Sequence, residues 1–253
     1  GFTRSTDTDG FYLASGIEFY PSENTMVGLS GYFSEIDAKA PLAQTADSQT
    51  LAASVYASHQ LDSGLILDGQ LSLGQLSFDT NRTVNLLGNE QTLTSESSDL
   101  LFSGGIGLSY DIPAGEHTFS PVIEFRYARV ELDTTEETGG SLALQFDRDV
   151  YDSTQGRAGF DYELASSGIQ VNSTAQLVWE FTEGPQLLGA QFVNGTGPSA
   201  NFVINGNERT WGEVGAYVAF GEGPFTIGLG VDTTIGRSRA NTQVVRADAT
   251  FRF

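Results

Sequence analysis

Residues 225–232 read FTIGLGVD, and from Phe225 onward every second residue is large and apolar. The residues between them are Thr, Gly, Gly and Asp. Because successive side chains of a β-strand point to opposite faces, this period of two predicts a strand with one apolar and one polar face. Residues 245–253, at the end of the chain, repeat the pattern and finish with two alternating Phe residues. Both stretches are therefore predicted strands.

The same alternation extends over the rest of the chain. Further runs lie at 9–20, 25–36, 48–60, 65–80, 98–111, 118–131, 148–163, 169–181 and 209–220. Apolar residues spaced three and four apart, which mark an amphipathic helix, are absent, and Gly interrupts nearly every window. The chain is therefore predicted to be all-β, with about eleven strands visible in the sequence.

Composition excludes several classes of function. The 253 residues hold 12 Lys and Arg against 32 Asp and Glu, for a net charge of -20 and a pI near 4.1. A nucleic-acid partner is excluded, because a surface of this charge repels a polyanion. The absence of Cys removes disulfides, thiolate metal sites and Cys nucleophiles. A mean hydropathy of -0.15 fits a soluble protein as well as a membrane barrel, whose polar lumen dilutes its apolar outer face.

The connections between the predicted strands alternate in length. Short turns rich in Gly, Pro, Asn, Asp and Ser lie at 21–24, 61–64, 112–117, 165–167 and 221–224. Longer polar loops lie between them, at 37–47, 81–97, 132–147 and 182–208. Short turns at one end and long loops at the other are typical of bacterial outer-membrane proteins. The sequence thus predicts a transmembrane antiparallel β-barrel with its turns in the periplasm and its loops outside the cell.

Aromatic residues lie near both ends of the predicted strands. At the level of the short turns these are Phe19, Tyr20, Tyr110, Phe119, Tyr162, Phe220, Phe225, Phe251 and Phe253. Toward the long loops they are Phe11, Phe33, Phe78, Tyr127, Trp179 and Trp211. Two aromatic belts flanking an aliphatic band are expected at the two membrane interfaces. Within the band, the alternation predicts that these side chains face lipid: Leu65, Leu67, Leu71, Ile227 and Leu229.

The number of strands bears on the start of the chain. Closed single-chain bacterial barrels usually have an even number of strands, with both termini in the periplasm. Counting back from a periplasmic Phe253, residues 1–4 are expected to be the end of an earlier, outward-running strand. We therefore predict one barrel domain over 1–253, with about twelve strands and a first strand that is truncated or missing in this chain. Alternatively 141–147 forms a further strand, although an extended hairpin in an external loop is the preferred interpretation.

In each strand, the residues that alternate with the outward-facing apolar ones are assigned to the lumen. Charges of both signs are among them: Glu18, Asp68, Glu124, Arg126, Arg157, Asp161, Glu180, Glu213, Asp232, Arg246, Asp248 and Arg252. Because an unpaired buried charge is costly, these residues predict either a hydrated channel or a cavity cross-linked by ion pairs. For any single residue, a solvated or ion-paired lumen charge is favoured over a specific role.

Enzyme signatures are weak. The only candidate bases are His59, near the periplasmic end of its strand, and His117, in a short turn. The acidic pair Glu136 and Glu137 is expected to be solvated in a loop, where nothing raises a carboxyl pKa. We predict no catalytic residues, no metal site and no cofactor.

The ordered set of strand motifs resembles a known family. The opening hairpin comprises 9–19 (DGFYLASGIEF) and 25–32 (TMVGLSGY), and a second hairpin follows with VYAS at 55–58 and LDGQL at 67–71. A middle signature, DVYDSTQGRAG, lies at 149–159, and the chain ends on a strand with a terminal Phe, 245–253. Over nearly the whole chain these motifs are similar to the translocator (β) domain of the autotransporter family, the type V secretion proteins of Gram-negative bacteria.

The resemblance implies a function in the outer membrane. A passenger N-terminal to the barrel would be exported to the cell surface and anchored there, with a linker helix threading the lumen. The other implied partners are lipid, lipopolysaccharide and the outer-membrane assembly machinery, which would read the C-terminal strand through Val245, Phe251 and Phe253. The alternative is a free-standing outer-membrane channel or adhesin-type barrel. A passenger encoded upstream in the same reading frame favours the translocator.

Overall fold

The computed structural model describes residues 7–40, 44–148, 150–182, 186–193, 195, 199–204, 208–221, 224–237 and 241–252. Strands β1 to β16 account for most of them. No helix of a length and apolarity suited to crossing a membrane occurs among these residues. Every element from β1 to β16 is a strand, and the described residues contain no helix, which confirms the all-β prediction.

The strands have the following bounds: β1 (Asp7–Ser22), β2 (Thr25–Ala40), β3 (Gln44–Gln60), β4 (Leu65–Leu86), β5 (Asn89–Tyr110), β6 (Ile112–Ala114), β7 (His117–Glu131), β8 (Thr135–Glu136), β9 (Leu144–Asp147), β10 (Tyr151–Ser166), β11 (Ile169–Glu180), β12 (Gln186–Phe192), β13 (Ala200–Ile204), β14 (Thr210–Phe220), β15 (Phe225–Ile235) and β16 (Gln243–Phe251).

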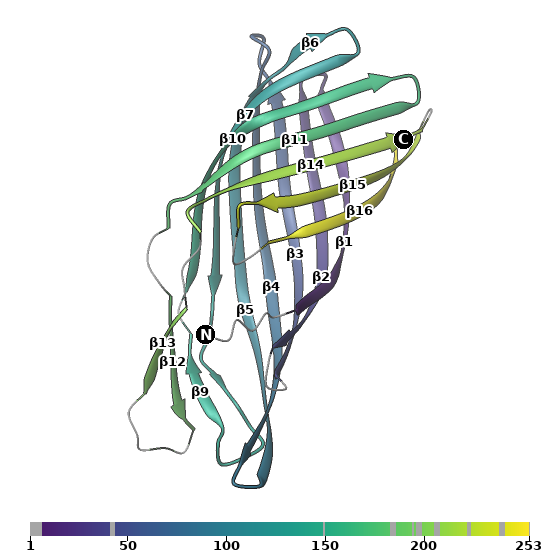
Figure 1. Ribbon diagram of the computed structural model, residues 1–253. Helices are drawn as coiled ribbons and strands as arrows, with labels where there is room; N and C mark the ends of the chain where they lie inside the picture. The colour runs from purple at the N-terminus through teal and green to yellow at the C-terminus, as the bar shows by residue number, and fades with distance from the viewer. Residues whose placement is uncertain are drawn as a thin grey trace.

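One curled antiparallel sheet contains most of these strands. Its neighbours follow in the order β1-β2-β3-β4-β5-β7-β10-β11-β14-β15-β16, while the short β6 also pairs with β7. These eleven strands correspond one to one to the eleven runs of alternation in the sequence. Figure 1 shows them side by side, curling from the purple β1 to the yellow β16. This order, in which each strand pairs with its predecessor among the eleven, is that of the up-and-down barrel wall predicted from the sequence.

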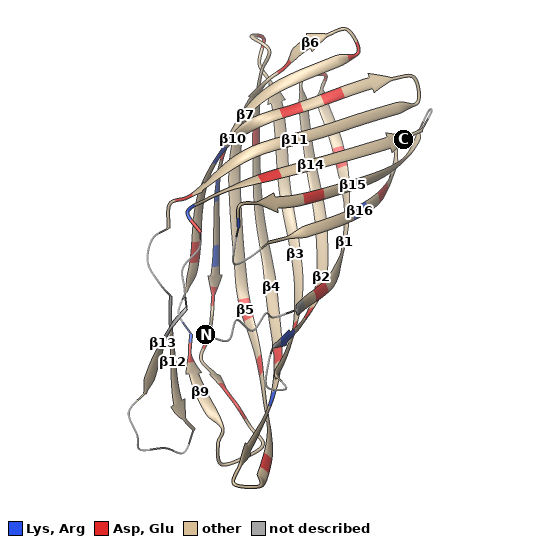
Figure 2. Ribbon diagram, in the orientation of Figure 1, with Lys and Arg blue, Asp and Glu red and all other residues tan. Residues whose placement is uncertain are grey.

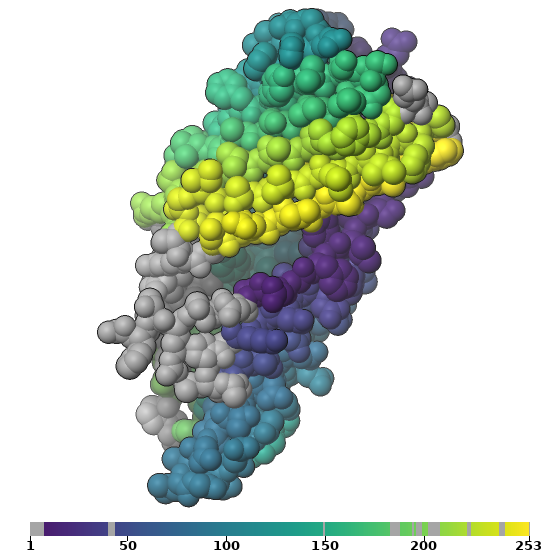
Figure 3. All heavy atoms as spheres, turned by 45° about the vertical axis from the view of Figure 1, so that its right-hand side comes forward, coloured from purple at the N-terminus to yellow at the C-terminus, as the bar shows by residue number. Residues whose placement is uncertain are grey.

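The two edge strands of this sheet run in the same direction, from the long-loop end to the short-turn end, because an odd number of antiparallel strands separates first from last. No pairing of β1 with β16 occurs among the described residues. Figure 3 shows a hollow between the yellow β16 and the purple β1. The earlier strand expected from residues 1–4 lies outside the described residues.

Register assigns the two faces of the sheet as the alternation predicted. Leu67, Leu71, Ile227 and Leu229 are 49–55% exposed on the outer face, and Leu65 shares their parity. Large apolar side chains exposed over a continuous sheet surface suit contact with lipid. Most residues of the inner face are small or polar, which allows the sheet to curl around a polar interior.

In the aromatic belt predicted toward the long loops, two residues do not face outward as a belt requires. Trp211 pairs in register with Val178 on the inner face and is 3% exposed, while the outer parity of its strand is Gly212, Val214 and Val218. Phe78 faces inward opposite Ser48. Both residues lie toward the long-loop end as expected, but their parity was overlooked.

The long loops contain more strand than the sequence indicated. The predicted loop 81–97 is a hairpin, because β4 and β5 each run for 22 residues and turn at Leu87 and Gly88, whose φ angles are 53° and 85°. Two left-handed residues are the usual requirement of a tight hairpin turn. The predicted loop 37–47 is likewise mostly strand, with β2 ending at Ala40 and β3 beginning at Gln44. Polar residues on both faces hid these extensions from the apolar pattern.

A second sheet forms outside the main one. The predicted loops 132–147 and 182–208 contribute four strands in the order β13-β12-β9-β8. Strand β9 lies within 141–147 and pairs with β12 and β8, so that this segment belongs to an external structure and not to the main sheet. Thr94 and Thr138 form a bridge that joins the external segment to β5. On this side the wall of the barrel therefore continues beyond the membrane-spanning part.

Candidate functional site on the inner face of the barrel

The inner face brings together eleven of the twelve residues assigned to the lumen. In register these are Glu18, Asp68, Glu124, Arg126, Arg157, Asp161, Glu180, Glu213, Asp232, Arg246 and Asp248. The twelfth, Arg252, follows the end of β16 and is exposed. The candidate site is the polar interior formed by these side chains, and the contacts among them separate it into distinct groups.

Arg157 is the most buried of the inner-face cations. Its guanidinium donates to Glu213 at 2.7 and 3.3 Å and to the Gln155 side chain at 2.9 Å, and its side chain is 10% exposed. To reach Glu213 on β14, it passes over Val178 of the intervening β11, which is fully buried. The Trp211 indole donates a further bond to Glu213 at 2.8 Å. This bidentate pair ties three strands together across the inner face.

Glu180, at the long-loop end of β11, is surrounded by hydrogen-bond donors. Its carboxylate accepts bonds from the Ser153 hydroxyl at 2.6 Å and from the backbone amides of Thr154 at 2.9 Å and Thr182 at 3.1 Å. Its side chain is buried, with 5% of the residue exposed. Glu180 has the inner parity of β11, where it anchors the ends of β10 and β11 and does not present a free charge.

Two more ion pairs lie on the inner face. Arg126 and Glu124 are neighbours on one side of β7, 2.7 Å apart. Arg246 on β16 donates to Asp232 on β15 at 2.8 Å and lies 5.6 Å from the centre of the Tyr217 ring. Each pair is partly exposed toward the interior, which indicates hydrated surroundings.

The remaining acidic residues have tyrosine partners or none. Glu18 accepts hydrogen bonds from Tyr20 at 3.0 Å and Tyr56 at 3.2 Å, and Asp248 accepts one from Tyr217 at 3.0 Å. Within the described part of the chain, Asp68 and Asp161 have neither an ion pair nor a side-chain hydrogen bond.

Two hollows open along this face. One, of about 210 Å³, is lined by Tyr56, Asp68, Glu124 and Arg126 among others. The other, of about 370 Å³, is lined by residues that include Asp161 and Arg246. Polar hollows of this size have room for ordered water. The interior between the strands is therefore suited to a hydrated polar ligand.

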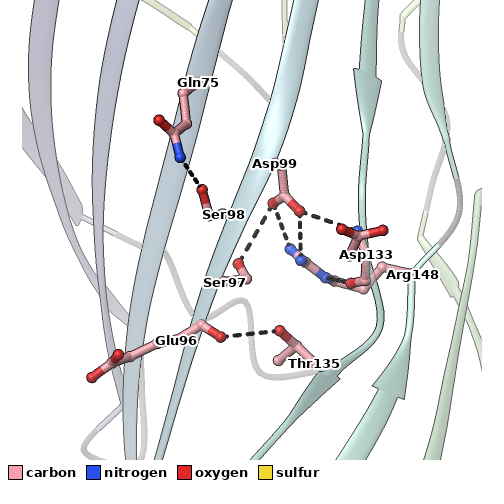
Figure 4. A network of polar contacts seen from close by, with 8 residues as sticks. All are labelled: Gln75, Glu96, Ser97, Ser98, Asp99, Asp133, Thr135 and Arg148. Carbon is pink, nitrogen blue, oxygen red and sulfur yellow. Dashed lines mark hydrogen bonds and ion pairs between the residues drawn. The ribbon is translucent and has the colours of Figure 1, made fainter.

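Sequence reasoning missed a buried network at the outer rim, which is drawn in Figure 4. Arg148 donates to the Asp99 carboxylate at 2.8 and 3.0 Å, and Asp99 also accepts the backbone N–H of Asp133 at 3.1 Å. Arg148 completes its contacts by donating to the Asp133 carbonyl at 2.8 Å. Asp99 has the inner parity of β5, which is the one signal that could have identified it.

A second buried pair was also missed. Arg82, near the end of β4, donates to Glu137 at 2.5 and 2.6 Å and to the Leu142 carbonyl at 3.1 Å. Glu137 is only 4% exposed, so its prediction as a solvated loop residue was wrong. The cause is tertiary: the segment after β7 folds against the extended β4–β5 hairpin and encloses the carboxylate.

The remaining predicted residues are placed as follows. His59 is an exposed neighbour of Thr25, at 2.9 Å, and His117 lies 2.8 Å from the Tyr162 hydroxyl. Among the described residues no group of three or more His, Cys, Asp or Glu could hold a metal ion. Val245 and Phe251 are 80% and 63% exposed on the outer face of β16, and Phe253 lies outside the described residues.

Comparison with known proteins identifies the family of this chain. The family model of the autotransporter beta-domain matches residues 1–232. No curated protein matches the chain. Among solved structures, the translocator domain of NalP from Neisseria meningitidis superposes with a TM-score of 0.77 at 14% identity, covering 98% of this chain and 82% of that one.

Two further autotransporter structures are similar. The β domain of BrkA from Bordetella gives a TM-score of 0.65 at 16% identity, covering 98% of this chain and 92% of that one. The transport unit of AIDA-I from Escherichia coli gives 0.59 at 13% identity, covering 99% and 84%. Identities this low support the fold alone, whereas the family match spans most of the sequence. The chain therefore belongs to the autotransporter beta-domain family, the outer-membrane translocator domains of type V secretion.

Proposed function

We propose that this domain carries an N-terminal passenger through its lumen and then anchors it at the cell surface. A linker helix joined to the passenger would lie in the lumen against the inner-face charges assigned from the sequence. The observation that carries this proposal is the contrast between the two faces of the sheet. An apolar exposed outer face encloses a polar inner face with hollows beside Asp68 and Asp161. A wall of this kind suits a polar chain that must cross lipid.

We further propose that one domain over 1–253 acts as a twelve-stranded barrel. The edge strands β1 and β16 run in the same direction, so that a single strand of opposite direction between them would complete an antiparallel barrel. Closure would also satisfy the exposed backbone groups of both edges, which are unfavourable in lipid.

The C-terminal strand is the proposed assembly signal. Val245 and Phe251 project from the outer face of the edge strand β16. In the sequence, Phe253 follows Phe251 at the same spacing of two. An edge strand with unsatisfied backbone groups can be recruited by strand addition, which is how the assembly machinery would recognise it. After insertion, the outer face would contact lipid and lipopolysaccharide.

The experiment uses the complete gene product in its host. External protease should remove a surface passenger from intact cells and leave the barrel in the outer membrane. A version without the barrel should leave the passenger in the periplasm. A passenger that reaches the surface equally well without the barrel would contradict the proposal.

The alternative is a free-standing channel or adhesin-type barrel. It predicts a steady conductance in planar bilayers that an added linker-helix peptide does not reduce. The translocator predicts that this peptide lowers the conductance.

A further inference from the structure

The three Arg residues on the inner face of strands β7, β10 and β16 are all engaged, whereas Arg252, which shares the parity of Arg246, lies beyond the end of β16. Each guanidinium has a carboxylate partner within 2.8 Å: Arg126 with Glu124, Arg157 with Glu213, and Arg246 with Asp232. Lys39, the one Lys of the sequence, has the outer parity of β2. None of these described cations remains available to neutralise a further carboxylate.

Acidic side chains on the same face exceed these pairs. Figure 2 shows the excess of red over blue along the strands. Apart from Glu180, which Ser153 and two backbone amides enclose, the inner-face carboxylates without a cationic partner among the described residues are Glu18, Asp68, Asp111, Asp161, Glu163 and Asp248. Their hydrogen bonds come from neutral donors, such as Tyr56 to Glu18 and Ser120 to Asp111, which do not cancel the charge.

These carboxylates are distributed around the wall. Glu18 lies on β1, Asp68 on β4, Asp161 on β10 and Asp248 on β16, near the two hollows or the edge strands. Low-dielectric walls focus the field of such charges into the space that they enclose. A cation in the lumen therefore meets an attractive potential from several sides, whereas an anion is repelled.

We infer that the lumen is selective for positive charge, and that the polypeptide segment held in it presents Lys and Arg side chains to these carboxylates. The inference rests on the proposed translocator function for the identity of the occupant, a segment of the exported polypeptide. An acidic or wholly apolar segment would leave the six carboxylates uncompensated and lose the attraction. Without an occupant, the same charge makes the lumen pass cations in preference to anions.

The first test measures ion selectivity. The chain is reconstituted in planar bilayers under a tenfold KCl gradient, and the reversal potential should have the sign of a cation-selective pore. The double variant Asp68→Asn, Asp161→Asn should move the reversal potential toward zero. The matched control is Asp79→Asn, the same change at an exposed position of outer parity on β4, which should leave it unaltered. A pore that is anion-selective, non-selective or closed to both ions would overturn the inference.

The second test identifies the class of occupant. Two 20-residue helical peptides of equal length and apolar content, one with Lys and one with Glu at its polar positions, are added to the wild-type pore. The Lys peptide should reduce the conductance, and the double Asn variant should require about tenfold more of it, in line with the loss of two partly solvated ion pairs. Equal block by the Glu peptide, or unchanged block of the variant, would overturn the inference. If these tests succeed while no passenger reaches the cell surface, the translocator proposal fails and the charge selectivity stands.

Discussion

Replacing Arg148 by Gln removes the cationic partner of the most deeply buried carboxylate at the outer rim. The Asp99 side chain is 0% exposed and that of Arg148 is 15% exposed. Two guanidinium bonds are lost, while the Asp133 amide at 3.1 Å still donates to Asp99. Breaking a buried ion pair from one side typically costs about 3–5 kcal/mol. Because the backbone donor remains, we expect about 3 kcal/mol, or roughly two orders of magnitude in the opening of this segment.

Hydrogen exchange measures this opening directly. The amides of Thr94 and Thr138 donate to each other's carbonyls at 3.0 and 2.8 Å, and this bridge holds the segment after β7 against β5, five residues along each segment from Asp99 and Asp133. In Arg148→Gln they should exchange about a hundredfold faster than in the wild type. Amides of the β10–β11 ladder should keep their rates, since the membrane-spanning sheet does not depend on this pair.

Two further variants make the measurement decisive. Arg129→Gln is the matched control, because Arg129 forms an exposed pair with Glu131 at 3.1 Å and its loss should hardly alter exchange. Adding Asp99→Asn to Arg148→Gln should slow exchange again, since no buried charge is then left alone. If Arg148→Gln exchanges no faster than Arg129→Gln, the argument from burial is refuted.

Other predictions address the two faces and the end of the sheet. Leu229→Arg should destabilise the barrel by roughly 2–4 kcal/mol in urea unfolding in lipid, whereas Gln176→Arg on the inner face should cost much less; equal losses would contradict the assignment of faces. Phe253→Ser should reduce assembly in cells more than the stability of the refolded barrel, so normal insertion in cells would remove its role as a signal. Gly28→Ala should displace the Tyr56 ring, which a Cβ at this position would overlap, and cost about 1 kcal/mol with loss of the bond to Glu18; an unchanged unfolding midpoint would argue against this contact.

Membrane-level strands were predictable because lipid imposes a strict pattern on one face. The stretch 225–232 shows it clearly: its apolar residues must be exposed to lipid, and its Gly and Asp residues face the interior. The same parity groups the charged residues on the opposite, inner face, since a single well-defined strand fixes both of its faces. Where parity was not applied, as for Trp211, the prediction was wrong.

Contacts between distant strands were not predictable in this way. Arg157 reaches Glu213 across an intervening strand, and this contact depends on strand order and register. Asp99 and Arg148 are 49 residues apart, and the sequence assigned Asp99 to the strand 98–111 and Arg148 to the start of the strand 148–163, with another strand between them. No periodicity within a strand carries this information.

Beyond the apolar band, hydrophobic alternation cannot fix the register between neighbouring strands, so other contacts must do so. The β4–β5 hairpin is polar on both faces there, so a slip by one residue would not transfer apolar side chains from lipid to the interior. The pairs Arg82–Glu137 and Arg148–Asp99 both connect this hairpin to the segment between β7 and β10. A bidentate buried pair fits only one alignment, because any slip leaves both charges desolvated and without partners. The charges that composition alone could describe only as an acidic excess are therefore of two kinds: buried pairs align the wall toward the long loops, and carboxylates without cationic partners occupy the inner face of the main sheet.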